Sequence, residues 1–329
     1  YSKATGIPNL RREIASKYLK KYGVRLDPEN ETIVCLGSKE GFSHICLSLV
    51  GPGDTAIVPA PYFPVHVYAV ALAAANVIAL EVADSEKFLS NVAYTCQHLY
   101  PKPKLLIVNY PHNPSAVTVE KEFFVDVVKL ARKYGFMVIS DFAYADVAFD
   151  GYQPPSFLSA PGARSVGVEF TTMSKGYNMA GWRVGWLTAP PEAMKGPREL
   201  KQDMSICTTA VSQYAALAFL DVPEAWMAAR REAFARRRDE AIAGLRGSGL
   251  VPVTPDAFPS LLVDVRAVDE DDRRFASRAR DEAGVIVQPA SVFGSATSGF
   301  VRLDLGAPAA ALREGIVRLA GFATKERPS

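Results

Sequence analysis

Apolar positions along the first two-thirds of the chain alternate between helical spacing and short continuous runs. Residues 10–22 predict a helix that ends at Gly23, because one helical stripe carries the apolar residues Leu10, Ile14, Tyr18 and Tyr22. Short apolar runs bounded by Gly, Pro or Asp predict strands at residues 31–36, 55–59, 77–82, 104–109, 136–140, 167–173 and 183–188. Runs that are apolar throughout suit strands buried on both faces of a mainly parallel sheet.

The pattern changes at about residue 226. A long charged helix begins there, a break with Gly and Pro follows at 247–259, and a strand, helix, strand and helix complete the chain. We therefore predict an α/β fold with two domains. The large domain, over 1–235, has a mainly parallel seven-stranded sheet, and the small C-terminal α/β domain covers 236–329. Because the sequence begins at Tyr1 without a Met, we expect an N-terminal segment to precede it.

Charge and cysteine spacing exclude several classes of protein. The chain has 37 basic and 35 acidic residues, so its composition gives no support for a nucleic-acid partner. The four cysteines form no C-x-x-C motif, so neither a disulfide framework nor a zinc ribbon is expected, and a reducing cytoplasm fits best. No apolar run reaches about 18 residues, so no membrane span is expected.

The basic residues of the long helix form a run at helical spacing. Acidic residues are interleaved with them, which indicates a solvated helix face. The run consists of Arg230, Arg231, Arg236, Arg237 and Arg238, among Glu232, Asp239 and Glu240.

Two segments that follow predicted strands could bind a ligand. Residues 36–41 lead into a helix, where free backbone N–H groups and the helix dipole can hold a phosphate, although glycines are common at such turns. Their spacing is not that of a P-loop. Residues 109–115 contain an Asn-Pro pair, which usually marks a plain turn, but a strand-end Asn can also aim its amide at a ligand. In open α/β sheets, ligands gather at the carboxyl ends of the strands.

Two charged residues follow further predicted strands. A buried Asp141 needs a cation, a metal or a protonated ring nitrogen, unless it caps the next helix. No second carboxylate or His cluster accompanies it, so no metal is expected. Lys175 has Thr172 and Ser174 before it and Arg183 eight residues later, which suggests a site for an aldehyde and a phosphate, although it could be an ordinary surface lysine. Its amine condenses with an aldehyde only when neutral, and burial near other cations favours that state.

Taken together, these residues resemble a known family. Asn113, then Asp141 with Tyr144, then Lys175 with Arg183 are similar in order and spacing to the fold-type-I, class I/II aminotransferases, which use pyridoxal 5'-phosphate (PLP). The similarity extends from Tyr1 to the last helix. Four segments most resemble bacterial alanine aminotransferases and then LL-diaminopimelate aminotransferases: residues 37–41, 100–104, 141–146 and 175–183.

This resemblance implies a role for each site residue. Lys175 binds PLP as an internal imine and afterwards moves the proton between the substrate α-carbon and the cofactor. Asp141 keeps the pyridine nitrogen protonated, Asn113 and Tyr144 bond the ring oxygen, and Phe63 stacks on the ring. The cofactor phosphate is held by Ser38, Lys39, Thr172, Ser174 and Arg183.

The resemblance also implies substrates and a partner. Arg302, with Asn113 nearby, binds the substrate α-carboxylate by a two-pronged hydrogen bond. Tyr1 reaches the cofactor phosphate of a neighbouring subunit, so the enzyme is expected to be a homodimer with shared active sites. The expected reaction is the ping-pong transfer of an amino group from an L-amino acid, with alanine and glutamate as the first pair, to a 2-oxo acid.

Three departures from the family pattern keep alternatives open. Phe63 stands where close relatives place a Tyr, and residues 204–209 and 258–261 differ where such enzymes shape the substrate pocket. A PLP-dependent lyase or cyclase of amino-acid specialised metabolism could use the same fold. A PLP-sensing transcription regulator is a second alternative, and it would need a DNA-binding module before Tyr1.

Overall fold

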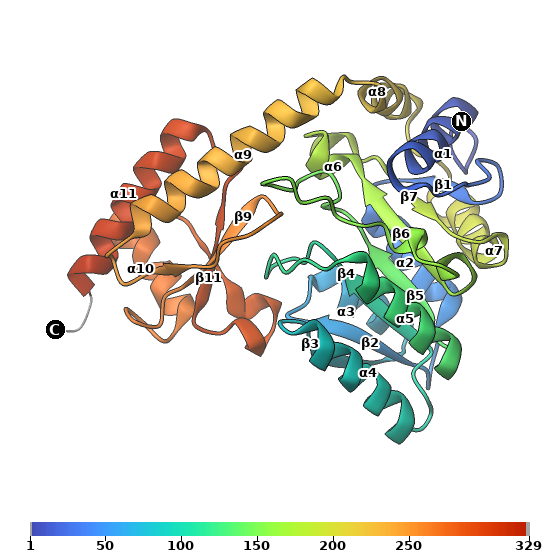
Figure 1. Cartoon of the computed structure of the whole chain (residues 1–329), viewed down its shortest axis with the longest axis horizontal. Helices are drawn as coiled ribbons and strands as arrows, with labels where there is room; N and C mark the ends of the chain where they lie inside the picture. Colours follow the sequence, from blue (N-terminus) through green and yellow to red (C-terminus); the bar gives the residue numbers. More distant parts are fainter. Residues whose placement is uncertain (1, 327–329) are drawn as a thin grey trace.

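The computed structural model describes residues 2–326 and contains two β-sheets (Figure 1). The larger sheet has seven strands in the order β1-β7-β6-β5-β4-β2-β3. Their bounds are β1 (Thr32–Cys35), β2 (Thr55–Ala60), β3 (Asn76–Glu81), β4 (Leu105–Asn109), β5 (Met137–Asp141), β6 (Gly167–Thr172) and β7 (Gly185–Thr188). Each predicted strand is present, and the predicted seven-stranded sheet is confirmed.

Six strands of this sheet run in the same direction. β2 is parallel to β3 and β4, and the parallel pairing continues through β5 to β6. β7 is antiparallel to both β6 and β1, so β1 points the same way as the other five. The carboxyl ends of the six parallel strands and the amino end of β7 therefore lie along one edge of the sheet.

Helices cover both faces of the large sheet, which explains the continuous apolar runs. Alternate residues of β4, such as Leu106 and Val108, pack into a core with α1 (Pro8–Tyr22), α4 (Ser85–His98), α5 (Lys121–Tyr134) and α8 (Ala210–Leu220). Leu105 and Ile107 point to the other face, into a core with α2 (Ser38–Leu49), α3 (Pro64–Leu72) and α7 (Pro191–Leu200). Since successive strand residues point to opposite faces, a strand covered on both sides is apolar at every position.

The smaller sheet has four antiparallel strands in the order β10-β11-β9-β8. They are β8 (Val251–Pro252), β9 (Ser260–Asp264), β10 (Gln288–Pro289) and β11 (Phe300–Asp304). The helices α9 (Glu224–Leu245), α10 (Asp272–Ala283) and α11 (Ala309–Glu326) pack on it around a separate apolar core. α9 runs from α8 to the small sheet, where it lies beside α11 (Figure 1). The predicted domain boundary at residue 235 falls inside α9 and stays a prediction.

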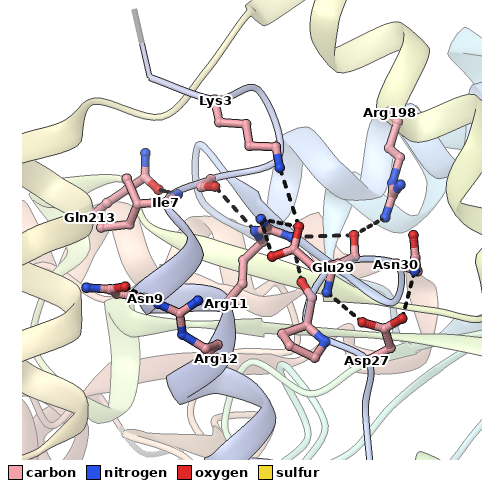
Figure 2. Close-up of polar contacts among 12 residues, drawn as sticks. Lys3, Ile7, Asn9, Arg11, Arg12, Asp27, Glu29, Asn30, Arg198 and Gln213 are labelled. Carbon is pink, nitrogen blue, oxygen red and sulfur yellow. Dashed lines mark hydrogen bonds and ion pairs between the residues drawn. The ribbon is translucent and has the colours of Figure 1, made fainter.

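A buried arginine holds α1 against the loop that enters β1 (Figure 2). The side chain of Arg11 has no exposed surface, and it donates to both carboxylate oxygens of Glu29, at 3.0 and 2.9 Å, and to the carbonyl oxygen of Pro28 at 2.6 Å. Lys3 pairs with the same carboxylate at 3.4 Å, and Arg198 of α7 donates to the Glu29 carbonyl oxygen at 2.6 Å. These contacts tie α1 and α7 to the start of the sheet.

Two arginines of the basic run in α9 do not lie on the solvated face that their spacing predicts. Arg238 is buried and pairs with Asp150 at 2.6 Å and with Asp239 at 2.8 Å. Arg230 is partly buried and donates to the carbonyl oxygen of Lys175 at 2.9 Å. For these two arginines the prediction was wrong, because they face segments that follow strands of the large sheet: α6 after β6, and the loop after β5.

Membrane-crossing segments were not expected from the sequence. Within residues 2–326, no helix combines the length and the apolar character that crossing a membrane requires.

A buried carboxylic acid lies within the large sheet, in β6. Glu169 has no exposed surface and accepts hydrogen bonds from the hydroxyls of Tyr18 at 2.9 Å and Ser156 at 2.7 Å, and from the backbone N–H of Phe157 at 2.8 Å. Burial outweighs these contacts and raises the pKa of Glu169 to about 7. The acid is therefore protonated in the folded protein at a pH where the unfolded chain ionises it.

This raised pKa predicts a pH-dependent stability. Because the folded state holds the proton more tightly, the stabilisation is complete below the unfolded pKa of 4.5 and is lost as the pH rises through about 7. The expected loss is about 3 kcal/mol between pH 5 and pH 8. Urea denaturation of the wild-type and Glu169→Gln proteins should show this loss as a pH-dependent difference between them, because other titrating groups such as His112 act equally in both. Parallel pH dependences in the two proteins would contradict the assignment.

Candidate active site

Every predicted site residue in the described part of the chain lines one cavity at the carboxyl edge of the large sheet, and Arg302 reaches it from the small sheet. This cavity has a volume of about 390 Å³. Its walls are formed by Ser38, Lys39, Phe63, Asn113, Asp141, Ala143, Tyr144, Thr172, Ser174, Lys175, Ala180, Arg183 and Arg302. Tyr1 lies outside the described residues. A larger cleft of about 700 Å³, between α1 and the start of α9, is lined by none of the predicted residues.

Asp141 is the last residue of β5, and three neighbours hold it in place. Its Oδ2 lies 3.0 Å from Nε2 of His66, and its Oδ1 accepts the backbone N–H of Ala143 at 3.2 Å. Its carbonyl oxygen accepts from the amide of Asn109 at 2.8 Å, and the side-chain oxygen of Asn109 accepts the backbone N–H of Asn113 at 3.0 Å. The carboxylate is therefore fixed in orientation at the cavity wall, and Asn109 links the backbone of Asp141 to the end of β4.

Sequence reasoning missed His66 as the partner of Asp141. His66 lies in the first turn of α3, is fully buried, and packs its ring against Phe42 and edge-on to Phe63. The only sequence signal was its position three residues after Phe63, in the segment that follows β2. A histidine there pairs with Asp141 only because the chain folds β2 next to β4 and β4 next to β5.

Arg302 reaches the cavity from the small sheet. It donates to Oδ1 of Asn113 at 3.0 Å and to Oε1 of Gln288 at 2.6 Å, and its guanidinium carbon lies 4.7 Å from the ring centre of Phe293. Asn113 in turn donates to the hydroxyl of Tyr144 at 3.3 Å. Burial, followed by the charge of Asp141, raises the pKa of Tyr144 well above its usual value, so the phenol keeps its proton. These hydrogen bonds form one network that runs from the small sheet to the loop after β5.

Lys175 lies in the short helix α6 (Met173–Gly176), directly after β6. The hydroxyl of Thr172 caps this helix by accepting the backbone N–H of Ser174 at 3.2 Å. The Lys175 ammonium lies 5.8 Å from the ring centre of Tyr144. Burial lowers the pKa of Lys175, and the positive charges of Arg302, Lys39 and Arg183 lower it further, while Asp304 opposes them. The amine is thus held closer to its neutral, nucleophilic form.

The turn between β1 and α2 lies beside Arg183, which stands just before β7. Gly37 caps α2 with φ 75° and ψ 165°, a backbone conformation that is almost restricted to glycine. A Cβ atom at Gly37 would lie 2.2 Å from Nη2 of Arg183. Arg183 itself has φ 53° and donates to the carbonyl oxygen of Ala180 at 2.7 Å. Ser38, Lys39 and this guanidinium therefore lie at one corner of the cavity with Thr172 and Ser174, where free N–H groups at the start of a helix suit an anion.

Comparison with a family model supplies the deciding observation. The model of the aminotransferase class I and II family matches residues 1–319. The chain belongs to the class I/II aminotransferases. This confirms the family resemblance seen in the sequence. Enzymes of this family move amino groups between amino acids and 2-oxo acids and depend on PLP.

Individual relatives of this aminotransferase agree with that placement. It is 38% identical to the glutamate-pyruvate aminotransferase AlaC of Escherichia coli (strain K12), over 93% of the chain and 74% of the relative. It is 37% identical to the LL-diaminopimelate aminotransferase of Desulforudis audaxviator (strain MP104C), over 98% of the chain and 82% of the relative.

Solved structures confirm the fold of this aminotransferase as fold type I. The N-succinyldiaminopimelate aminotransferase from Mycobacterium tuberculosis superposes with a TM-score of 0.91 at 28% identity, covering 98% of this chain and 85% of that one. A double mutant of the Thermus thermophilus aspartate aminotransferase superposes with a TM-score of 0.89 at 30% identity, covering 98% and 83%.

The three departures from the family pattern occupy different places in this aminotransferase. Phe63 lines the cavity, with the Lys39 ammonium 5.0 Å from its ring centre. Phe258, at φ 92°, is buried and packs edge-on to Tyr144 at 4.5 Å between ring centres. Residues 204–209 line no part of the 390 Å³ cavity and connect a π-helical turn to α8. Phe258 thus supports Tyr144 from behind, a contact that no sequence pattern indicated.

Gly37, at this corner of the cavity, gives a test of the turn's backbone geometry. Gly37→Ala should lower the free energy of unfolding by at least about 1 kcal/mol more than Gly135→Ala, because the backbone conformation at Gly37, with ψ 165°, is less accessible to alanine than the left-handed one at Gly135, with ψ 28°. Gly135 is the matched control, with a φ of 77° and no atom within 4 Å of the position that a Cβ would occupy. Equal losses in urea denaturation would contradict the backbone conformation described for Gly37.

Proposed function

We propose that PLP binds in the 390 Å³ cavity and is attached to Lys175. The residues present fit this cofactor. A corner rich in N–H groups and a guanidinium, where a Cβ would fill the space at Gly37, suits a phosphate. The oriented carboxylate of Asp141 suits a protonated ring nitrogen, and an amine of lowered pKa suits an aldehyde. The observation that carries the proposal is the convergence of Lys175, Asp141 and Arg183 on one cavity.

The contacts assign a task to each wall of the site. Asp141, held by His66 and by the N–H of Ala143, would keep the proton on the ring nitrogen. Asn113 and Tyr144 would bond the ring oxygen, and Phe63 would cover one face of the ring. The phosphate would be held by Ser38, Lys39, Thr172, Ser174 and Arg183. When bound, PLP supplies an electron-accepting ring that stabilises the electron pair left on the substrate α-carbon.

The chain's own groups would orient the substrate and move the proton. Arg302 would exchange its contact with Asn113 for the substrate α-carboxylate, because a planar guanidinium binds a carboxylate through two parallel hydrogen bonds. Nζ of Lys175 would then take the proton from the substrate α-carbon and deliver it to the cofactor. Gln288 and Phe293 hold the guanidinium on its far side, so it stays aimed into the cavity.

We propose that the reaction is a ping-pong transfer with L-alanine and L-glutamate as amino donors. The 38% identical relative is a glutamate-pyruvate aminotransferase, which supports this pair. The 37% identical relative is an LL-diaminopimelate aminotransferase, so this diamino acid is the second candidate. We also propose that the enzyme is a homodimer in the cytoplasm, in which Tyr1 of one subunit reaches the cofactor phosphate of the other.

A half-reaction tests this function. When L-alanine is added to the PLP-loaded protein without an oxo acid, the absorbance should change to that of pyridoxamine phosphate, with one equivalent of pyruvate released per site. L-Glutamate and LL-diaminopimelate are tested in parallel, with products identified by mass. In Lys175→Ala the conversion should be at least about 100-fold slower, because the proton-transferring amine is gone.

Other products would decide against transamination. Ammonia or a cyclic product without pyridoxamine phosphate would indicate the lyase or cyclase alternative. No spectral change with any amino acid, in a protein that has bound PLP, would leave a sensor role as the better explanation.

A further inference from the structure

A buried carboxylate closes the turn that the proposed function assigns to the cofactor phosphate. Glu40 lies in the first turn of α2, and its Oε2 accepts the backbone N–H of Leu36 at 2.6 Å. Leu36 is the residue before Gly37, and its carbonyl oxygen lies 3.5 Å from Nη2 of Arg183. The side chain of Glu40 therefore bridges from the helix back to the entry of the turn, one residue beyond the N-cap that the acidic residue of a capping box contacts.

The other contacts of Glu40 come from a distant part of the chain. The ammonium of Lys201 lies 2.9 and 3.0 Å from its two carboxylate oxygens, and the hydroxyl of Ser205 donates to Oε1. The side chain of Lys201 is 1% exposed and that of Glu40 is 11% exposed. Burial alone would raise the pKa of Glu40, but the bonds from Ser205, Lys201 and Leu36 outweigh it and lower the pKa, so the carboxylate is ionised.

Lys201 and Ser205 are the two ends of an unusual helical turn. Residues Lys201–Ser205 form a π-helix at the end of α7, and Ile206 follows with φ 60° and ψ −80°. π-helical turns are rare and occur frequently at functional sites. Both ends of this π-helical turn contact the carboxylate of Glu40. Glu40 and the π-helical turn therefore hold each other in place. The segment that joins the π-helix to α8 is held at its far end by Gln213 of α8, whose amide donates to the carbonyl oxygen of Thr208 at 2.6 Å.

We propose that Glu40 is a positioning residue for the phosphate-binding turn, and that its ion pair with Lys201 anchors this turn to the π-helical segment 201–205. This inference rests on the proposed function, because it assumes that the cofactor phosphate binds at residues 37–39. Glu40 does not line the cavity, so it acts through the backbone of Leu36 and not by contact with the ligand.

The mechanism predicts a defect that is specific for the phosphate group. If the carboxylate loses its charge, Lys201 is left without its counterion and the turn loses its anchor, while Lys175, Asp141 and Tyr144 keep all their contacts. Binding of the ring and the aldehyde should then be preserved, and binding of the phosphate should weaken. General destabilisation would weaken both.

Pyridoxal, which lacks the phosphate, separates these two outcomes. Absorbance titrations of the wild-type and Glu40→Gln proteins with PLP and with pyridoxal give four dissociation constants. Glu40→Gln should weaken PLP binding by about tenfold or more and change pyridoxal binding by less than about threefold, since the turn loses the ion pair that anchors it. An equal loss for both ligands, or no loss for PLP, would overturn the inference. A wild-type protein that fails to bind PLP would refute the proposed function first and the inference with it.

A second glutamate offers a matched control. Glu31 accepts the backbone N–H four residues before it, from Asp27 at 2.7 Å, and pairs with Arg164 from a distant segment. It lies at the opposite end of β1 from the turn, so Glu31→Gln should leave both dissociation constants unchanged within about threefold.

The double variant Glu40→Gln/Lys201→Met protects the test against misfolding. It removes both charges, so no unpaired ion is left buried and the fold is retained. The turn still loses its anchor, and the loss of PLP affinity should match that of Glu40→Gln while pyridoxal binding is again preserved. Wild-type PLP affinity in the double variant would overturn the role of the ion pair.

Discussion

The single carboxyl edge of the large sheet is the constraint on which the site depends. Six parallel strands must end on the same side, and the one antiparallel strand must begin there. β5 and β6 therefore deliver Asp141 and Lys175 to neighbouring positions, β1 delivers the glycine turn, and the reversed β7 brings Arg183 back beside it. Residues that are far apart in the sequence, such as Gly37 and Arg183, meet because of strand direction alone.

Concentrating charge at this edge has an electrostatic consequence. Each buried ion needs a counterion or hydrogen bonds, and the contacts of Asp141 with His66 and of Glu40 with Lys201 meet that need. The cations that remain around the cavity act on Lys175, whose pKa they lower together with burial. The same arrangement that would hold an anionic cofactor thus also prepares the amine that would bind it. Arg302 completes the cavity from the small sheet, so the site requires both sheets.

Much of this arrangement could be predicted from the sequence, because its signals are local. Apolar runs between Gly, Pro and Asp located all seven strands, and a functional residue directly after a strand pointed to the edge. The spacing from Lys175 to Arg183 is set by the short connection between the adjacent antiparallel strands β6 and β7, so it can be recognised in the sequence.

The missed contacts depend on packing between distant segments. His66 lies 75 positions from Asp141, and Lys201 lies 161 positions from Glu40, so no spacing links them. The spacing of Arg230 and Arg238 fits a solvated helical face. Only the course of α9 between the two sheets shows that these two side chains are not solvated. The π-helix at Lys201–Ser205 has no sequence signature at all, because it results from how α7 ends against α2.

Reductive trapping tests the central claim most directly. The protein is incubated with PLP, reduced with borohydride, digested and mapped by mass spectrometry. The account predicts one phosphopyridoxyl group per chain, on Lys175, with the lysines at positions 39 and 201 unmodified. Labelling spread over surface lysines, or a protein that stays colourless and carries no adduct at Lys175, would contradict it.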